Sequence, residues 1–311
     1  MKSGEPPEQK CLWTNLAAEK KTELAEVPAK LLAAIPGMRL GTSAFTAAGW
    51  AGTFYPAGLS PRDYLSYYSR QFDTVEVDST FYKCPTSSTV RGWYGKTPRG
   101  FIFSAKVPQS ITRDKCLVDC GAEMTEFLST MELLGEKLGP LLLQFGYFSE
   151  TDFRGVEAFQ ARLIPFLDKL PPSHRYVVEI RNKQWLVPEF TEALRQRGVA
   201  LALTALSWMP TWLSEPEEWS RRKLDLVTAG FTYIRWLGDR KGIEAMTKSW
   251  DKTVVDRTSD LQKWVEACEK IRRRGVEIYA YANNHYAGHG PATLALFAKL
   301  LGNRTEPEND G

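Results

Sequence analysis

Eight short apolar segments recur along the chain, and a longer segment with apolar residues at helical spacing follows each of them. Short runs rich in β-branched and aromatic residues are typical of buried strands, while apolar residues every three or four positions are typical of helices. The alternation therefore predicts a parallel sheet with helical crossovers. The eight predicted strands are Met38–Phe45, Thr74–Phe81, Phe101–Pro108, Leu138–Phe145, Arg175–Arg181, Val199–Leu206, Phe231–Gly238 and Glu277–His285.

Local signals mark the ends of several predicted helices. Ser60 precedes Pro61 as an N-cap, and Gly198 and Gly275 are placed as C-terminal caps just before the next strand. The predicted helices are Pro61–Gln71, Thr89–Lys96, Ala122–Lys137, Val156–Leu170, Pro188–Arg197, Glu215–Thr228, Asp260–Arg274 and Pro291–Leu301.

Eight strand–helix units over about 265 residues predict an α/β protein with a single-domain (β/α)8 TIM-type barrel, whose usual length is about 250 residues. A doubly wound open sheet is the alternative, but the first predicted strand is not followed by the glycine-rich turn of a dinucleotide-binding fold. We predict an N-terminal extension over residues 1–37, the barrel over 38–302 and a polar tail over 303–311.

Composition gives little support to several classes of partner. The chain has 311 residues, 25% charged residues and a net charge of +3, which is too small to indicate a polynucleotide track or a membrane surface. No apolar run approaches the length of a membrane span, and the polar first residues lack the apolar core of a signal peptide. Five cysteines without framework spacing, Cys11, Cys84, Cys116, Cys120 and Cys268, indicate free thiols and a cytoplasmic location.

The segment Thr74–Tyr82 places two carboxylates, Glu76 and Asp78, two residues apart in a predicted strand. Side chains alternate between the two faces of a strand, so both acids are expected on one face. Such a pair indicates either an edge strand with a wet face or a site.

Polar residues recur at the carboxyl ends of the other predicted strands, where barrel enzymes place their chemistry. This rim predicts a functional site; the alternative is that the cations merely neutralise Glu76 and Glu179 as structural ion pairs. The rim residues are Lys106, Gln144, Glu179, Arg181, Arg235, Asn283, Asn284 and His285.

Aromatic residues follow the same strand ends. Trp50, Tyr82 and Trp185 lie in the loops that follow the first, second and fifth predicted strands. Rings beside convergent polar groups are typical of a ligand pocket, and stacking favours a cyclic ligand. The alternative is that about half of the rings only pack the loops onto the barrel.

His285 is the strongest candidate for proton transfer, because imidazole titrates near neutral pH. As a metal ligand it would need partners such as Glu76 or Glu179, and the predicted rim holds at most two histidines. A divalent metal is therefore an open but not a favoured cofactor, and no residue is assigned as a metal ligand.

Several longer motifs resemble those of the domain of unknown function 72, or YecE-like, family. The resemblance covers about Arg39 to Leu301 and implies a TIM-type barrel, without a settled activity. Three positions depart from the family pattern: Asp78 stands where many members have Asn, Arg113 where His is usual, and Trp236-Leu-Gly238 lacks the common His-Gly ending. The motifs are Gly41-Thr-Ser43 with Trp50–Pro56, Glu76–Tyr82, Phe101–Pro108, Leu138–Phe145, Val178–Arg181 with Trp185, Tyr233–Arg235 and Asn283–Tyr286.

These residues predict an enzyme that acts on a small anionic, cyclic substrate bearing phosphate or carboxylate. Lys106, Arg181 and Arg235 would bind the anion, Glu76 or Glu179 would be the general base, and His285 would be the acid or an orienting group. Phosphoester hydrolysis is the first hypothesis. A non-catalytic nucleotide or nucleic-acid binding module is the alternative, and a glycoside hydrolase is a third, decided by the separation of the two carboxylates. The sequence does not determine the oligomeric state.

Overall fold

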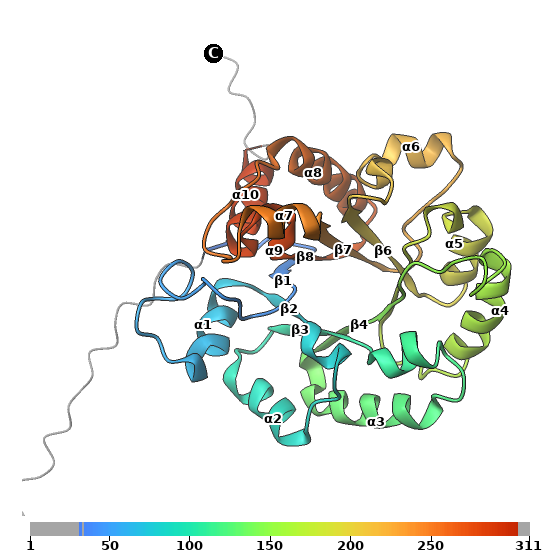
Figure 1. Cartoon of the computed structure of the whole chain (residues 1–311), viewed down its shortest axis with the longest axis horizontal. Coiled ribbons are helices and arrows are strands. Elements are labelled where there is room, and N and C mark those ends of the chain that lie inside the picture. The colour runs from blue at the N-terminus through green and yellow to red at the C-terminus, as the bar shows by residue number, and fades with distance from the viewer. Residues whose placement is uncertain (1–30, 33, 304–311) are drawn as a thin grey trace, which may run out of the picture.

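Eight parallel strands form a nearly closed ring in the computed structural model, which describes residues 31–32 and 34–303 (Figure 1). Neighbouring strands pair in the order β1-β8-β7-β6-β5-β4-β3-β2, and the predicted (β/α)8 TIM-type barrel is confirmed. Most of the predicted N-terminal extension and C-terminal tail lies outside the described residues. The strands are β1 Met38–Thr42, β2 Thr74–Val77, β3 Ile102–Lys106, β4 Leu138–Gln144, β5 Tyr176–Glu179, β6 Ala200–Leu206, β7 Phe231–Gly238 and β8 Glu277–Ala282.

Every predicted helix has a counterpart around this ring, and two short helices, α7 and α9, were not predicted. The helices are α1 Tyr64–Gln71, α2 Ser87–Lys96, α3 Gly121–Met131, α4 Val156–Leu167, α5 Pro188–Arg195, α6 Pro216–Arg221, α7 Arg240–Met246, α8 Thr258–Arg273, α9 Asn284–Ala287 and α10 Gly290–Gly302.

The first, second and eighth strands end at Thr42, Val77 and Ala282, earlier than predicted. After Val77 the chain turns into a 3₁₀ helix, Asp78–Phe81, and after Ala282 it turns into α9, capped by the Asn283 side chain. Asp and Asn side chains bond to nearby backbone and so favour turns and caps over strands. The alternation rule therefore does not extend to Asp78.

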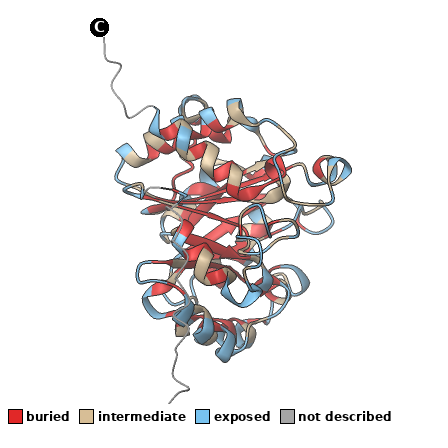
Figure 2. Ribbon diagram, turned by 90° about the vertical axis from the view of Figure 1, so that its left-hand side faces the viewer, coloured by how far each residue is buried: buried red, intermediate tan, exposed pale blue. Residues whose placement is uncertain are grey.

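The barrel interior is filled by side chains at alternate strand positions. Tyr233 of β7 and Tyr281 of β8 lie there with ring centroids 4.9 Å apart, and the Tyr281 hydroxyl lies 2.6 Å from Ser104 Oγ and 2.8 Å from Thr74 Oγ1. Buried hydroxyls without partners would cost free energy, so these contacts let tyrosines occupy an apolar interior. Figure 2 shows the buried strands at the centre, with exposed residues along the surrounding helices.

A tyrosine closes the seam between β1 and β2, which stand at the two ends of the pairing order. The Tyr68 hydroxyl of α1 accepts a hydrogen bond from the Thr42 backbone N–H at 2.7 Å and donates to the Thr74 carbonyl at 3.2 Å. A Cβ at Gly41 would collide with that carbonyl, so glycine permits the close approach of the two strands.

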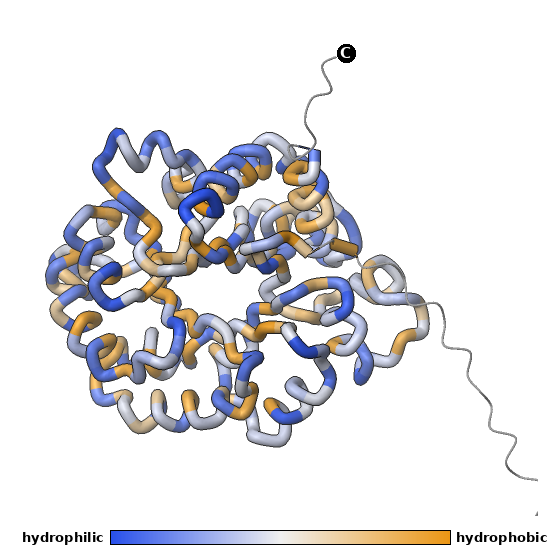
Figure 3. The backbone as a smooth tube through the Cα atoms, turned by 180° about the vertical axis from the view of Figure 1, so that it is seen from behind, coloured by the Kyte–Doolittle hydropathy of each residue, from blue (hydrophilic) through white to orange (hydrophobic). Residues whose placement is uncertain are grey.

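The outer helices mix hydrophobic and hydrophilic residues along their length, as seen from the opposite side in Figure 3. In α8, for example, Leu261, Trp264, Cys268 and Ile271 are buried at helical spacing. Among the described residues, no helix combines the length and the apolarity that crossing a membrane requires.

Candidate functional site

A cavity of about 720 Å³ opens among residues that end or follow strands β2 to β8. Its lining contains five cationic side chains and one carboxylate, that of Asp78. The cavity lining at the carboxyl ends of the strands therefore holds more cationic than acidic side chains, an arrangement that favours anionic ligands. The cations are Lys106, Arg113, Arg181, Arg235 and Arg240.

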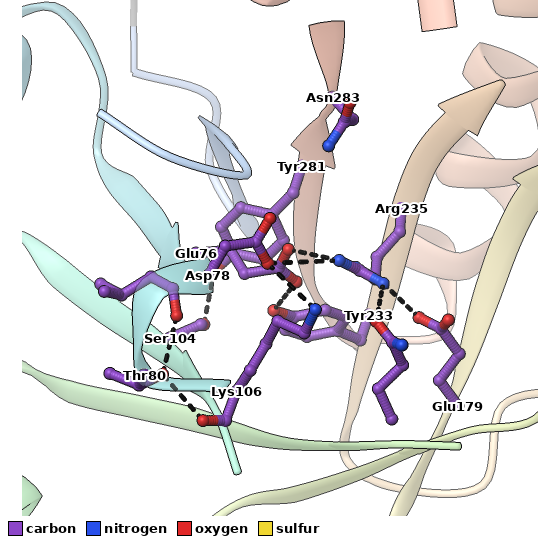
Figure 4. Close-up of polar contacts among 12 residues, drawn as sticks. Glu76, Asp78, Thr80, Ser104, Lys106, Glu179, Tyr233, Arg235, Tyr281 and Asn283 are labelled. Carbon is purple, nitrogen blue, oxygen red and sulfur yellow. Dashed lines mark hydrogen bonds and ion pairs between the residues drawn. The ribbon is translucent and has the colours of Figure 1, made fainter. Parts of the chain in front are cut away.

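Arg235 of β7 lies between two buried carboxylates (Figure 4). Its Nη2 is 2.7 Å from Glu76 Oε1, and its Nη1 is 2.5 Å from Glu179 Oε2 and 3.2 Å from Gln144 Oε1. Glu76 and Glu179 are 0% exposed. They are not among the lining residues, so within the described structure they act on the cavity through Arg235.

The two carboxylates differ in their proton affinity. Burial raises the pKa of Glu76 above its ordinary value, and Arg235 only partly offsets this effect. Burial also acts on Glu179, but Arg235 and Arg181 together outweigh it and hold the pKa of Glu179 below its ordinary value. The Tyr233 hydroxyl donates to Glu76 at 2.6 Å, while burial, followed by the Glu76 charge, raises the tyrosine pKa. Environments that separate two carboxylates in this way are frequent at functional sites.

Asp78 is the carboxylate that reaches the cavity. It begins the 3₁₀ helix after β2, and its side chain is 31% exposed. One oxygen lies 3.4 Å from Lys106 Nζ and 3.7 Å from Arg235 Nη2. The Lys106 ammonium also lies 4.4 Å from the centroid of the Phe81 ring. Glu76 and Asp78 thus meet the same arginine, but a turn after β2, and not the predicted strand alternation, brings Asp78 there.

Exposed rings surround the cavity entrance. Tyr82, Tyr147 and Trp208 line the cavity and are 73%, 65% and 48% exposed. Arg181 donates from Nε to Glu179 Oε1 at 3.1 Å, and its guanidinium lies 6.0 Å from the Trp208 ring centroid. This arrangement places flat apolar surfaces beside cations, as recognition of a ring-bearing anion requires.

His285 lies on the cavity wall next to the end of β8. Its Nδ1 is 2.7 Å from Asn283 Oδ1, its Nε2 is 3.1 Å from Glu244 Oε1, and the Trp250 ring packs against it at 4.6 Å between centroids. The structure therefore brings His285 and Asn283 to the same cavity as Lys106, Gln144, Arg181, Arg235 and Tyr82.

Three predicted ligand-binding residues lie elsewhere. Trp50 is buried, and its Nε1 donates to Asn284 Oδ1 at 3.3 Å. That same oxygen accepts the backbone N–H of Gly290 at 2.8 Å, so Asn284 joins the loop to α10. Trp185 is buried and stacks on Phe159 at 5.0 Å. Trp50 and Trp185 thus pack loops onto the barrel, which was the alternative to ligand binding. We assign a structural role, and not a ligand-binding role, to Trp50, Trp185 and Asn284.

Other cavity residues were missed. Thr112 and Arg113 belong to a π-helical turn, Ser110–Asp114, and Arg240 belongs to α7, as does Glu244, which contacts His285 but does not line the cavity. The sequence marks Arg113 only as a departure from the family pattern, and the single apolar residue buried in α7, Ile243, gives no helical periodicity. Across the part of the chain that the structure describes, no group of three or more His, Cys, Asp or Glu residues could hold a metal ion.

Comparison with known proteins identifies relatives along the whole barrel. The family described as "Protein of unknown function DUF72" matches residues 39–310. The chain is 32% identical to UPF0759 protein YecE of Escherichia coli K12 over 139 residues, which is 43% of this chain and about half, 47%, of that relative. It is 26% identical to UPF0759 protein YunF of Bacillus subtilis over 276 residues, 81% of this chain and 92% of that protein.

Solved structures extend the similarity to the fold. A DUF72 family protein from Thermotoga maritima is 26% identical, with a TM-score of 0.65 over 85% of this chain and 99% of that one. A DUF72 family protein from Enterococcus faecalis, 21% identical, has a TM-score of 0.60 over 85% of this chain and 95% of that one, which supports the fold alone. None of these names states an activity.

Proposed function

Since this chain belongs to the family described as a protein of unknown function, DUF72, we propose its function from the cavity itself: hydrolysis of a phosphoester in an anionic, ring-bearing substrate. The observation that carries the proposal is the excess of cationic over acidic side chains in the cavity lining, five against one, of which Arg235 is already paired with the buried Glu76 and Glu179. Fixed cations at the site of charge development are the largest stabilising contribution in phosphoryl transfer.

At least two of the five cations keep donors that they can offer to a phosphate. Among the described polar contacts, the Lys106 ammonium pairs with the Asp78 carboxylate at 3.4 Å, and Arg181 donates to Glu179 through Nε alone. The remaining N–H groups of both side chains are available to ligand oxygens. Arg235, by contrast, donates hydrogen bonds from both terminal nitrogens to Glu76, Glu179 and Gln144. We assign Lys106 and Arg181 to phosphate binding and Arg235 to holding the floor of the cavity.

The proposed chemistry uses Asp78 as the base and His285 as a group that orients the substrate. Asp78 takes a proton from water as the water oxygen bonds to phosphorus and the bond to the leaving oxygen breaks. The leaving alkoxide takes a proton from solvent water, and Asp78 returns its proton to solvent. Glu76 and Glu179, first considered as bases, are positioning residues in this scheme because both are fully buried and paired with Arg235.

The test is a panel of phosphomonoesters, phosphodiesters and nucleotides, with and without added divalent cations. Asp78→Asn should lower kcat/KM by about 100-fold or more, the range expected for loss of a general base, and should leave the melting temperature unchanged. Glu192→Gln is the matched control, because Glu192 pairs with Arg195 on α5 away from the cavity. Equal activity of Asp78→Asn and Glu192→Gln would refute the assignment.

A binding module without catalysis is the second candidate. It is favoured by the exposed rings Tyr82, Tyr147 and Trp208, which can stack on bases, and by the complete burial of two acids. This candidate predicts nucleotide or single-strand binding whose affinity falls as salt rises, without turnover by the wild-type protein.

The glycoside hydrolase alternative finds little support in the geometry. Arg235 bonds to both Glu76 and Glu179, so its guanidinium occupies the space between the two carboxylates. A glycosidic bond would have to lie there for the two acids to act on it.

A further inference from the structure

We propose that Arg240 and His285 form a second anion-binding subsite on the cavity wall, which the chain's own Glu244 carboxylate fills in this structure. The subsite would take a second phosphate or carboxylate group of the substrate. This inference rests on the proposed function and deepens it, because it identifies the substrate as a molecule with at least two anionic groups.

One carboxylate oxygen defines the position of the subsite. Glu244 Oε1 lies 2.8 Å from Arg240 Nε and 3.1 Å from His285 Nε2. Arg240 and His285 both line the cavity, whereas Glu244 is not among the lining residues. Hydrogen bonds from Arg240 and, next, from His285 hold the pKa of Glu244 below its ordinary value. Two donors therefore converge on one anionic oxygen at the edge of the cavity.

The hydrogen bonds of His285 set the direction of its donors. The backbone N–H of His285 donates to Asn283 Oδ1 at 2.9 Å, which fixes that amide oxygen as an acceptor. Ring Nδ1 lies 2.7 Å from the same oxygen, so it bonds there as a donor. Ring Nε2 faces a carboxylate oxygen and bonds to it when it carries a proton. When Nε2 carries a proton, its N–H is therefore aimed at the subsite.

The histidine is fixed more firmly than the carboxylate that it meets. Gly238, at the end of β7 with φ +72°, packs against the His285 backbone, and a Cβ there would collide with the His285 carbonyl. Trp250 covers one side of the ring. Glu244 is 37% exposed and pairs with an Arg240 side chain that is 74% exposed. Exposed pairs along a helix contribute little to stability, so a ligand anion can displace Glu244.

Strand order places the subsite across the cavity from the proposed phosphate site. Lys106 ends β3 and Arg240 follows β7. These two strands are four positions apart in the eight-stranded pairing order. In a ring of eight strands that separation is diametric. A substrate that reaches both would span the mouth, with its ring between the anionic groups.

Isothermal titration with inorganic phosphate, at constant pH and ionic strength, tests the proposal. Glu244→Gln should bind phosphate about 2- to 5-fold more tightly than the wild type, as expected when an exposed competing ion pair is removed. Glu192→Gln should bind as the wild type does. Adding His285→Gln to Glu244→Gln should abolish the gain. If Glu244→Gln and Glu192→Gln bind phosphate with equal affinity, the proposal is overturned.

NMR of the histidine rings separates this inference from the proposed activity. The chain has three histidines, so the His285 ring signals can be assigned with His285→Gln. Phosphate should move the His285 signals in Glu244→Gln, and should do so also after Lys106→Gln removes the proposed phosphate site. Unmoved His285 signals would refute the subsite. Moved signals without turnover of any phosphoester would retain the subsite and refute only the hydrolase.

Discussion

At the scale of single residues, Arg235 determines the character of the site. It holds two fully buried carboxylates, one on each terminal nitrogen, and a buried trio of this kind costs much desolvation free energy. Removing one member leaves a buried charge without compensation, which typically costs about 3–5 kcal/mol. The sequence predicted that these residues meet at one rim, but which carboxylates are buried and which one is accessible depends on turns after the strands.

The opposite pKa shifts of Glu179 and Glu76 predict opposite pH profiles. The lowered pKa of Glu179 means that its contribution to stability is present above its ordinary value of 4.5 and is lost as pH falls through the folded-state pKa. The raised pKa of Glu76 means that the folded state retains its proton, so stability falls as pH rises from 4.5 toward that pKa.

Urea unfolding of the wild type, Glu179→Gln and Glu76→Gln from about pH 3 to about pH 8 tests the direction in which each carboxylate changes stability with pH. The stability difference between the wild type and Glu179→Gln should grow with pH and level off above 4.5. The difference between the wild type and Glu76→Gln should shrink with rising pH. Difference curves of the same slope would contradict the account.

At the scale of elements, the sequence predicted strands better than the segments that follow them. The apolar runs of β4, β6 and β7 are buried along nearly their whole length, so their pattern and their burial coincide. The short turns after the strands, and α7, are set by capping, close backbone approach and long-range contacts such as Glu244 with His285. No local periodicity records these contacts, which explains why Arg240 and Glu244 were missed.

The seam between β1 and β2 gives a prediction at this scale. Tyr68→Phe removes the hydroxyl that joins the Thr42 N–H to the Thr74 carbonyl, and leaves two buried backbone groups without that partner. We expect a loss of about 1–3 kcal/mol in the free energy of unfolding, the cost of unsatisfied buried polar groups. Urea unfolding measures it.

Tyr64→Phe is the matched control for this substitution. Tyr64 also lies on α1, and its hydroxyl makes none of the hydrogen bonds recorded among the described residues; its ring stacks on Tyr55 at 3.9 Å. The control should change stability by less than about 0.5 kcal/mol. Equal effects of Tyr68→Phe and Tyr64→Phe would mean that the hydroxyl does not close the seam.

At the scale of the whole molecule, closure of the barrel turns separate strand ends into one cavity. Lys106, Arg181 and Arg235 come from strands that are far apart in the sequence, and only a ring of parallel strands brings their ends together. The alternation of predicted strands and helices along the sequence was enough to predict this fold. The positions of the aromatic rings could not be predicted in this way. Trp50 and Trp185 are buried, whereas Tyr147 and Trp208 line the cavity, and the composition of the loops does not distinguish buried rings from cavity rings.

The central claim is that this closed ring presents a cation-lined cavity that binds an anionic group. Anomalous diffraction from crystals soaked in tungstate, a tetrahedral oxyanion that scatters strongly, tests it directly. We predict a tungsten peak inside the cavity, with its oxygens within hydrogen-bond distance of Lys106 Nζ and Arg181, and the loss of this peak in Lys106→Gln crystals. Tungstate bound only outside the cavity, or an unchanged peak in Lys106→Gln, would contradict the account.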